Sequence, residues 1–190
     1  MDVGHICFSK KRKNTVISNI LGAAAYWGKS ELLNHMLKKI DKGFIDVQCL
    51  ESQDIMTGKA GPLQQEYLGY SPLMLAIVSP HSDLDVVKAL LAASANIHIT
   101  ERNTDNNLFH IGALHCDNKD VFTYIVRNLK IDIFKRNSKG ETAYSICQAN
   151  QDKEKLQVIE EVQKANDTHL SKADDLLKEL EDAEEKAKKK

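Results

Sequence analysis

The stretch that decides the fold is Gly69–Thr100, GYSPLMLAIVSPHSDLDVVKALLAASANIHIT. It predicts two short helices separated by a polar turn and followed by a short extended arm, SANIHIT. Ser71 is placed to cap the first helix, and Pro72 stands in its first turn, where a missing N–H costs nothing. Ser82 and Asp85 make a capping-box pattern at the start of the second helix. One helix pair cannot cover its own apolar face, so neighbouring units must bury it.

The same pattern recurs along the chain. Gly69, Asp105 and Gly140 mark equivalent turns, which lie 36 and 35 residues apart (105 − 69 and 140 − 105). An upstream copy runs through SNILGAAAYWGKSELLNHML, where Ala24 stands at the position that Ala76 takes later. A fixed period of this length predicts a repeat array, so we expect four units in a row.

These residues resemble the ankyrin-repeat family, whose pattern is roughly G-x-T-P-L-H-x-A-A-x-x-G followed by V-V-x-x-L-L-x-x-G-A-D-V-N-A. The chain has GYSPLMLAI, NNLFHIGA and GETAYSIC for the first part and VVKALLAASANIHI for the second. The resemblance implies an all-α solenoid of helix-turn-helix units with short extended arms. The second and third units carry about two and one extra residues between their helices, which makes the array divergent. The expected domains are a basic extension (1–14), repeats (15–47, 68–104, 105–139 and 140–162), an inserted loop (48–67) and a charged helical extension (163–190).

Composition excludes several classes of protein. The 26 basic and 27 acidic residues nearly balance, which argues against a surface built as a whole to collect nucleic acid or anionic lipid. No run approaches the roughly 18 apolar residues of a membrane span, and the amino terminus lacks the apolar core of a signal peptide. We therefore expect a cytoplasmic or nuclear protein. Disulfides and a four-cysteine zinc site are not expected, because the cysteines are scattered without a CxxC pair: Cys7, Cys49, Cys116 and Cys147.

The segment FHIGALHCD brings His110, His115 and Cys116 close together in the sequence. In the ankyrin pattern His110 takes the place of the histidine of P-L-H, so its implied role is structural hydrogen bonding near the turn. Cys147 falls at a small-residue core position and is expected to be a buried packing residue. The segment MTGKAG lacks the spacing that cradles phosphates. We predict no enzyme activity, no cofactor and no metal site.

The ankyrin resemblance also places the partner-binding residues, at the arm tips and just after the double alanine of each inner helix. Because aromatic residues and arginine dominate binding hot spots, Trp27, Tyr70, Arg102 and Arg136 are the leading candidates. For Trp27, packing under an amino-terminal extension is an equally open alternative, and for the arginines the alternative is ordinary solvation. The full candidate set is Tyr26, Trp27, Tyr70, Ser79, Arg102, Asn103, His115, Arg136, Ser138, Lys139 and Asn150.

After residue 162 the composition becomes charged, with a narrow apolar stripe of Leu170, Ala173, Leu177 and Leu180. This stripe predicts either a solvated capping helix or, over residues 170–187, a partner helix that forms a short coiled coil. The basic runs at 9–13 and 186–190 are candidates for an import signal or a nucleic-acid contact. They contain no aromatic residues that could stack on bases, which argues against binding of single-stranded nucleic acid.

We predict a non-catalytic protein-binding module or scaffold that holds its protein partner on the concave face of the array. Two alternatives stay open: a nucleic-acid or ribonucleoprotein adaptor that uses the lysine-rich ends, and a targeting domain of a larger enzyme. No membrane partner is expected.

Overall fold

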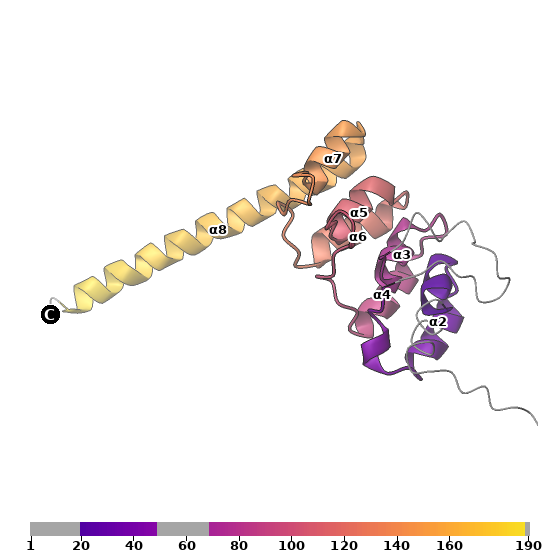
Figure 1. Cartoon of the computed structure of the whole chain (residues 1–190). Helices are drawn as coiled ribbons and strands as arrows, with labels where there is room; N and C mark the ends of the chain where they lie inside the picture. The colour runs from indigo at the N-terminus through magenta and orange to yellow at the C-terminus, as the bar shows by residue number, and fades with distance from the viewer. Residues whose placement is uncertain (1–19, 49–68, 189–190) are drawn as a thin grey trace, which may run out of the picture.

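The computed structural model describes residues 20–48 and 69–188, which form two layers of helices (Figure 1). Within these ranges the chain contains helices, turns and irregular segments and no strand. Residues 20–26 are helical and lie next to the first complete helix. The following elements are α2 (Ser30–Leu37), η1 (Lys42–Phe44), α3 (Pro72–Val78), α4 (Leu84–Ala92), α5 (Leu108–His115), α6 (Lys119–Asn128), α7 (Ala143–Ala149) and α8 (Lys153–Lys188).

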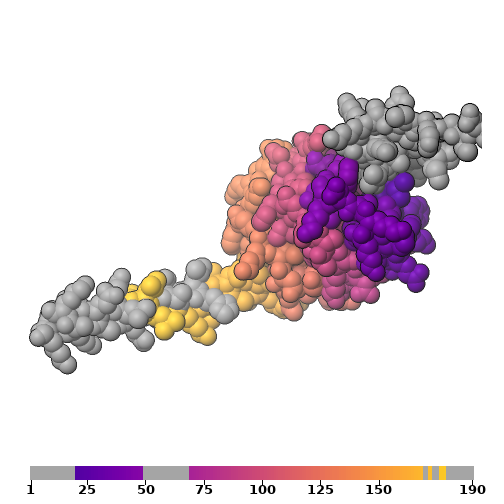
Figure 2. Space-filling view, turned by 90° about the horizontal axis from the view of Figure 1, so that it is seen from below, coloured from indigo at the N-terminus to yellow at the C-terminus, as the bar shows by residue number. Residues whose placement is uncertain are grey.

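The helices stack in an inner and an outer layer. In the inner layer α5 packs between α3 and α7, and in the outer layer α2, α4, α6 and α8 each contact the next. Each inner helix also packs on the outer helix that follows it in the chain. This is a helical solenoid of the ankyrin-repeat type, so the predicted fold class is confirmed. Figure 2 shows the stack as one compact body from which α8 projects.

The inner helices α3, α5 and α7 begin with the same capping geometry. In each, the N-cap side chain accepts the backbone N–H of the residue three positions on, while the side chain of that residue accepts the N–H of the N-cap residue. The N-cap residues are spaced by 36 and 35 residues, as the turn markers are (107 − 71 and 142 − 107). The predicted cap at Ser71 is confirmed; the N-cap residues are Ser71, Asn107 and Thr142.

The start of α4 differs from the sequence prediction. Its N-cap is Asp83, whose carboxylate oxygen accepts the N–H of Asp85 at 2.9 Å. The Ser82 hydroxyl is buried and has no hydrogen-bond partner among the described residues. The predicted capping box of Ser82 and Asp85 is therefore wrong. The chain enters the helix in an extended conformation at Asp83 (φ −121°, ψ 127°), so the carboxylate and not the hydroxyl faces the free N–H groups.

The turn markers have a common backbone conformation. Gly69, Asp105 and Gly140 have positive φ angles of 88°, 55° and 78°. Glycine adopts this left-handed region without strain, and aspartate enters it more readily than most other residues. The replacement of glycine by Asp105 is therefore compatible with the same turn.

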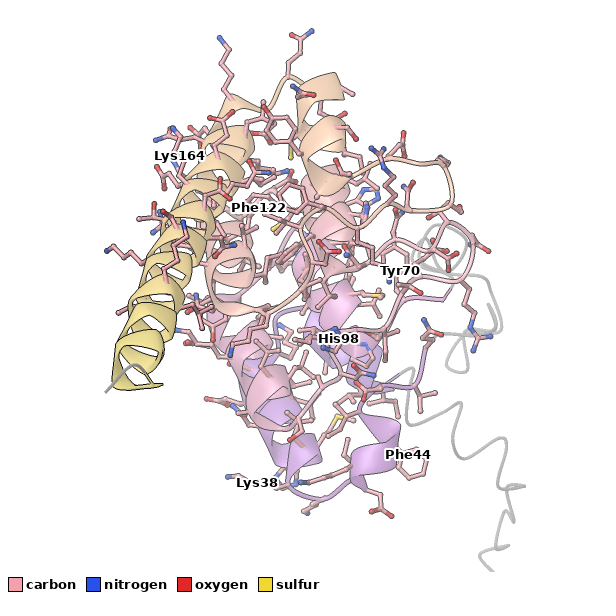
Figure 3. The ribbon with its side chains drawn as sticks, turned by 90° about the vertical axis from the view of Figure 1, so that its left-hand side faces the viewer. Lys38, Phe44, Tyr70, His98, Phe122 and Lys164 are labelled. Atoms are coloured by element: carbon pink, nitrogen blue, oxygen red, sulfur yellow. The ribbon has the colours of Figure 1, made fainter. Side chains whose placement is uncertain are left out.

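The last helix is much longer than the others and is continuous from the stack into solvent. Val158 and Ile159 are buried against the stack, whereas Leu177 is 58% exposed on the projecting part (Figure 1). Lys164 lies on the side of the stack opposite Tyr70, which faces the arms (Figure 3). The expected boundary between residues 162 and 163 falls inside α8, so the charged extension continues the outer helix of the last unit. No described helix has the length and apolar character needed to cross a membrane.

Candidate partner-binding surface

Two buried polar residues anchor the tips of neighbouring arms. Glu101 is 4% exposed, and its carboxylate accepts the N–H of Asn103 at 2.6 Å. Asn137, 36 residues later and 6% exposed, accepts the N–H of Lys139 at 3.0 Å. Asn137 Nδ2 also donates to Asn106 Oδ1 at 2.9 Å, which joins its arm to the preceding one. The candidate set contains the exposed residues beside these anchors, and sequence reasoning did not predict the anchoring role of Glu101 and Asn137, although acidic and amide residues are typical of tight turns.

Further hydrogen bonds join successive arms into a row. The Ser138 N–H donates to the Thr104 carbonyl oxygen at 2.9 Å. Gln48 Nε2 donates to the Thr100 carbonyl oxygen at 2.8 Å, and Arg102 Nε donates to Gln48 Oε1 at 2.9 Å. Because these bonds hold each arm against its neighbour, less conformational entropy would be lost when a partner binds the arms.

The arm tips carry exposed cations, with the exposed carboxylates of Asp105 and Glu141 in the same turns. Arg102, Arg136 and Lys139 all have exposed side chains, as do Asn103 and Ser138 beside them. The bond from Arg136 Nη1 to the Gly140 carbonyl oxygen, at 2.6 Å, uses one of the five N–H donors of the guanidinium group. A guanidinium held in this way presents a planar fork that suits a carboxylate. The arm row thus has the chemistry to receive an acidic segment.

A second group of predicted residues lies where the inner helices end. Trp27 is 49% exposed; its ring stacks on His81 with centroids 5.3 Å apart and meets Tyr26 edge-on at 5.5 Å. His115 and Asn150 are exposed at the ends of α5 and α7. Sequence reasoning missed His81, although it noted extra residues in the turn SPHSDLD. The signal that could have identified His81 is its place in this lengthened turn, which follows the inner helix as Trp27 follows its own helix.

Two predicted binding residues are buried. Tyr70 is 6% exposed and Ser79 is 2% exposed, so a partner on this surface would have almost no access to them. The Ser79 hydroxyl donates to the Tyr26 carbonyl oxygen and accepts the His81 N–H at 2.9 Å. Ser79 therefore joins the first unit to the second. Its place after the inner helix is the one expected for a binding residue, but the longer turn of this unit folds over it.

His110 has the structural role that the ankyrin pattern implies. Its Nε2 lies 3.0 Å from the Glu141 carbonyl oxygen, and its Nδ1 accepts the Asn107 N–H at 3.2 Å. Burial is the largest of the effects that together lower the pKa of His110 below 6.5. The ring is thus a neutral link between the third and fourth units. Among the described residues no group of three His, Cys, Asp or Glu side chains is arranged to hold a metal ion.

The two described cysteines are poorly suited to nucleophilic chemistry. Cys116 and Cys147 are both fully buried, and burial raises the pKa of each thiol to about 11. Since the thiolate is the reactive form, both groups stay protonated at neutral pH.

A small hollow beside Cys116 has a volume of 140 Å³, below the roughly 300 to 1,000 Å³ of small-molecule sites. Lys155 lines it, and its ammonium group is paired with Asp152 at 3.2 Å and lies 5.5 Å from the centre of the Phe122 ring. The basic group is therefore already engaged by its neighbours.

Comparison with known families supports the assignment that the geometry suggests. The sequence model of the ankyrin repeat matches residues 68–102, which contain α3, α4 and the arm that ends at Arg102. Residues 68–102 are an ankyrin repeat. Ankyrin repeats typically act as protein-interaction modules without catalysis of their own, and this one lies in the middle of a stack of helix pairs. The comparison with curated proteins found no match to the chain.

Proposed function

We propose that the chain is a non-catalytic protein-interaction module that binds an acidic segment of a partner protein along its arm tips. The observation that carries this proposal is the row of exposed cations, Arg102, Arg136 and Lys139, on arms that hydrogen bonds join to one another. Trp27 and His81 provide a separate aromatic contact where the inner helices end. The ankyrin repeat at residues 68–102 supports the protein-interaction role.

Binding would proceed by recognition on a rigid surface. Each arginine would pair with a carboxylate of the partner through two parallel N–H···O bonds, which are stronger than neutral hydrogen bonds. The arms are ordered by Glu101 and Asn137 before the partner arrives, so little binding energy is lost to ordering them. Truncation of a central arginine or aromatic side chain at such a hot spot typically costs about 2 kcal/mol or more of binding free energy.

The remaining parts of the prediction stand as proposals beside this one. We assign further units of the array to residues 15–47, 105–139 and 140–162, and a role as a partner helix to residues 170–187. The alternative of a nucleic-acid adaptor rests on the basic runs at 9–13 and 186–190, whose side chains lie outside the described residues, so no observation favours it. The location in cytoplasm or nucleus stays a prediction.

The test is capture of partners from cell lysate by the full chain and by two charge-reversal variants. Arg102→Glu with Arg136→Glu changes the arm tips, and Lys164→Glu with Lys172→Glu makes the same change in charge on exposed positions of α8. We expect the native chain to capture partner proteins that the arm variant no longer captures and that the α8 variant still captures. An acidic peptide from such a partner should then bind the arm variant at least about tenfold more weakly.

Both variants must first show an unchanged thermal unfolding midpoint, because Arg102 also bonds to Gln48. Partners that are retained equally by the arm variant and the native chain would refute the proposal. Partners lost only from the α8 variant would assign recognition to the projecting helix.

A further inference from the structure

The first unit has exposed apolar side chains at positions that are buried in the units after it. Leu32 on α2 is 50% exposed, whereas its equivalents, Val86 on α4 and Val121 on α6, are both 0% exposed. In the outer layer α4 packs on α2, and α6 packs on α4. In the described part of the chain no helix precedes α2 in the outer layer.

The inner layer shows the same difference. Ile20 is 48% exposed, whereas Pro72 and Leu108, which open the next two inner helices, are buried. Ala23 is partly exposed, although Leu75 at the same position is 5% exposed. We call Ile20, Ala23, Leu32 and the partly buried Met36 the end face. Helix α2, which carries Leu32 and Met36, lies at the end of the stack opposite α7 (Figure 1).

The composition of the end face is unlike that of a terminal repeat. Terminal units of repeat arrays carry polar residues on their outer side, because no neighbour protects that side from water. Here the first unit has isoleucine, leucine and methionine at positions that a neighbouring unit would have to bury. The end face is therefore built to be covered.

We infer that the amino-terminal segment 1–8, MDVGHICF, folds back onto the end face and acts as the cap of the array. This segment carries Val3, Ile6 and Phe8, and it is joined to Ile20 by residues 9–19. At about 3.3 Å per residue these linking residues span up to roughly 36 Å, well beyond the 8–10 Å between packed helices. The basic run at 10–13 would keep the linker in solvent while the apolar segment docks.

A tethered segment fits this face better than a second copy of the chain does. A stable complex between separate chains buries about 800 Å² on each partner, and a few half-exposed side chains provide less than that. A segment of the same chain needs less area, since its effective concentration at the face is in the millimolar range, on the order of that for short flexible linkers.

Cys7 lies within the proposed cap and reports whether it is docked. The experiment measures the rate at which a maleimide labels Cys7 in the full chain with Cys49→Ser, compared with a synthetic peptide of residues 1–19. The peptide has the same neighbouring lysines, so it controls for their effect on the thiol. Cys116 and Cys147 are buried, and their lack of labelling shows in every variant that the stack is folded.

We expect Cys7 to react at least about tenfold more slowly in the chain than in the peptide, because the cap must open first. Leu32→Glu should bring the rate close to that of the peptide, and the milder Leu32→Ala should raise it in part. Phe134→Glu, at a side chain 65% exposed on the third arm, is the matched control and should leave the rate unchanged.

Three results would overturn the inference. Labelling of the native chain at the peptide rate would show that the segment is not docked. Protection that Leu32→Glu leaves intact would place Cys7 elsewhere. Protection that increases with protein concentration would identify a second copy as the cover.

Discussion

At the residue scale, one position of the inner helix is filled by three different side chains that make the same local contact. Met74, His110 and Ser145 each accept the N–H of the residue that caps their helix. His110 also reaches the next unit, where its Nε2 meets the Glu141 carbonyl oxygen at 3.0 Å. The capping contact therefore tolerates varied residues, whereas the link between units depends on the imidazole.

The lowered pKa of His110 predicts how stability depends on pH. Burial lowers the pKa most and the charge of Lys135 adds to it, while hydrogen bonds to the Glu141 and Lys135 backbone and the charge of Glu141 oppose it. Below pH 6.5 the unfolded chain binds this proton more readily than the folded chain, so stability falls as pH decreases from 6.5 toward the folded pKa. Above pH 6.5 this contribution is fully present.

Urea unfolding at pH 7.5 and pH 5.5, which lie about one unit on either side of the ordinary histidine pKa of 6.5, measures this effect. His110→Gln should reduce the loss of stability between the two pH values, while the exposed His98→Gln should preserve it. An identical loss in the native chain and the His110 variant would contradict the assignment.

At the element scale, the turns between inner and outer helices are of two kinds. Gly28 and Gln151 follow their helices with φ angles of 61° and 57°, which closes a tight turn. Ser79 and Cys116 instead leave α3 and α5 in an extended conformation, with ψ angles of 134° and 110°. The extended turns occur in the units where the sequence shows extra residues, so the insertions lengthen the turn and leave the helices aligned.

Gly28→Ala should destabilise the protein by about 1–3 kcal/mol, because alanine is strained at this φ angle. The new Cβ would also lie 2.8 Å from the His81 carbonyl oxygen. Gly43→Ala is the matched control, since its Cβ would have no atom within 4 Å. Thermal or urea unfolding compares the two; equal stability of both variants would show that the backbone of this turn relaxes without cost.

At the scale of the whole molecule, α8 belongs to the stack at its start and leaves the stack over the rest of its length. Ile159 is 2% exposed, and Arg127 of α6 pairs with Glu161 at 2.6 Å on the surface beside it. Such an exposed ion pair contributes little, so the apolar contacts anchor the helix. The stack ends in this helix on one side and in the end face on the other (Figure 1).

Ile159→Ala should therefore lower the free energy of unfolding by about 2–5 kcal/mol, as for other large-to-small core substitutions. Leu177→Ala should change it by less than about 0.5 kcal/mol, because that side chain is exposed. Urea unfolding at several protein concentrations measures both. A large loss for Leu177→Ala that depends on concentration would show that the projecting helix is paired.

Much of the fold was predictable because its signals are local. The spacing of Gly69, Asp105 and Gly140 marked the period, and Ser71 with Pro72 marked a helix start, since these residues act on their own backbone. The start of α4 was misplaced by one residue, because Ser82 and Asp83 are both good capping residues and only the entry angle of the chain selects between them.

The candidate site was less predictable. The exposed state of Arg102 and Arg136 agrees with their expected place on the arms, but Tyr70 and Ser79 are buried. The position of a residue in the repeat predicts where its backbone lies, but it does not predict which residues of the next unit cover its side chain. The anchoring role of Asn137 was missed for the same reason, since its side chain bonds to Asn106 of the preceding arm. The role of Glu101 is local, because its carboxylate accepts the N–H groups of Asn103 and Thr104 in its own turn.

The sequence by itself determined the period, the helical units and the fold class, because capping, turn conformation and apolar spacing act over a few residues. Only the tertiary structure decided which candidates are exposed, which polar side chains join one arm to the next, and which end of the stack keeps an apolar face. The physical reason is that burial and hydrogen bonding between units depend on residues 30 or more positions apart, whose approach is set by stacking and has no local signal.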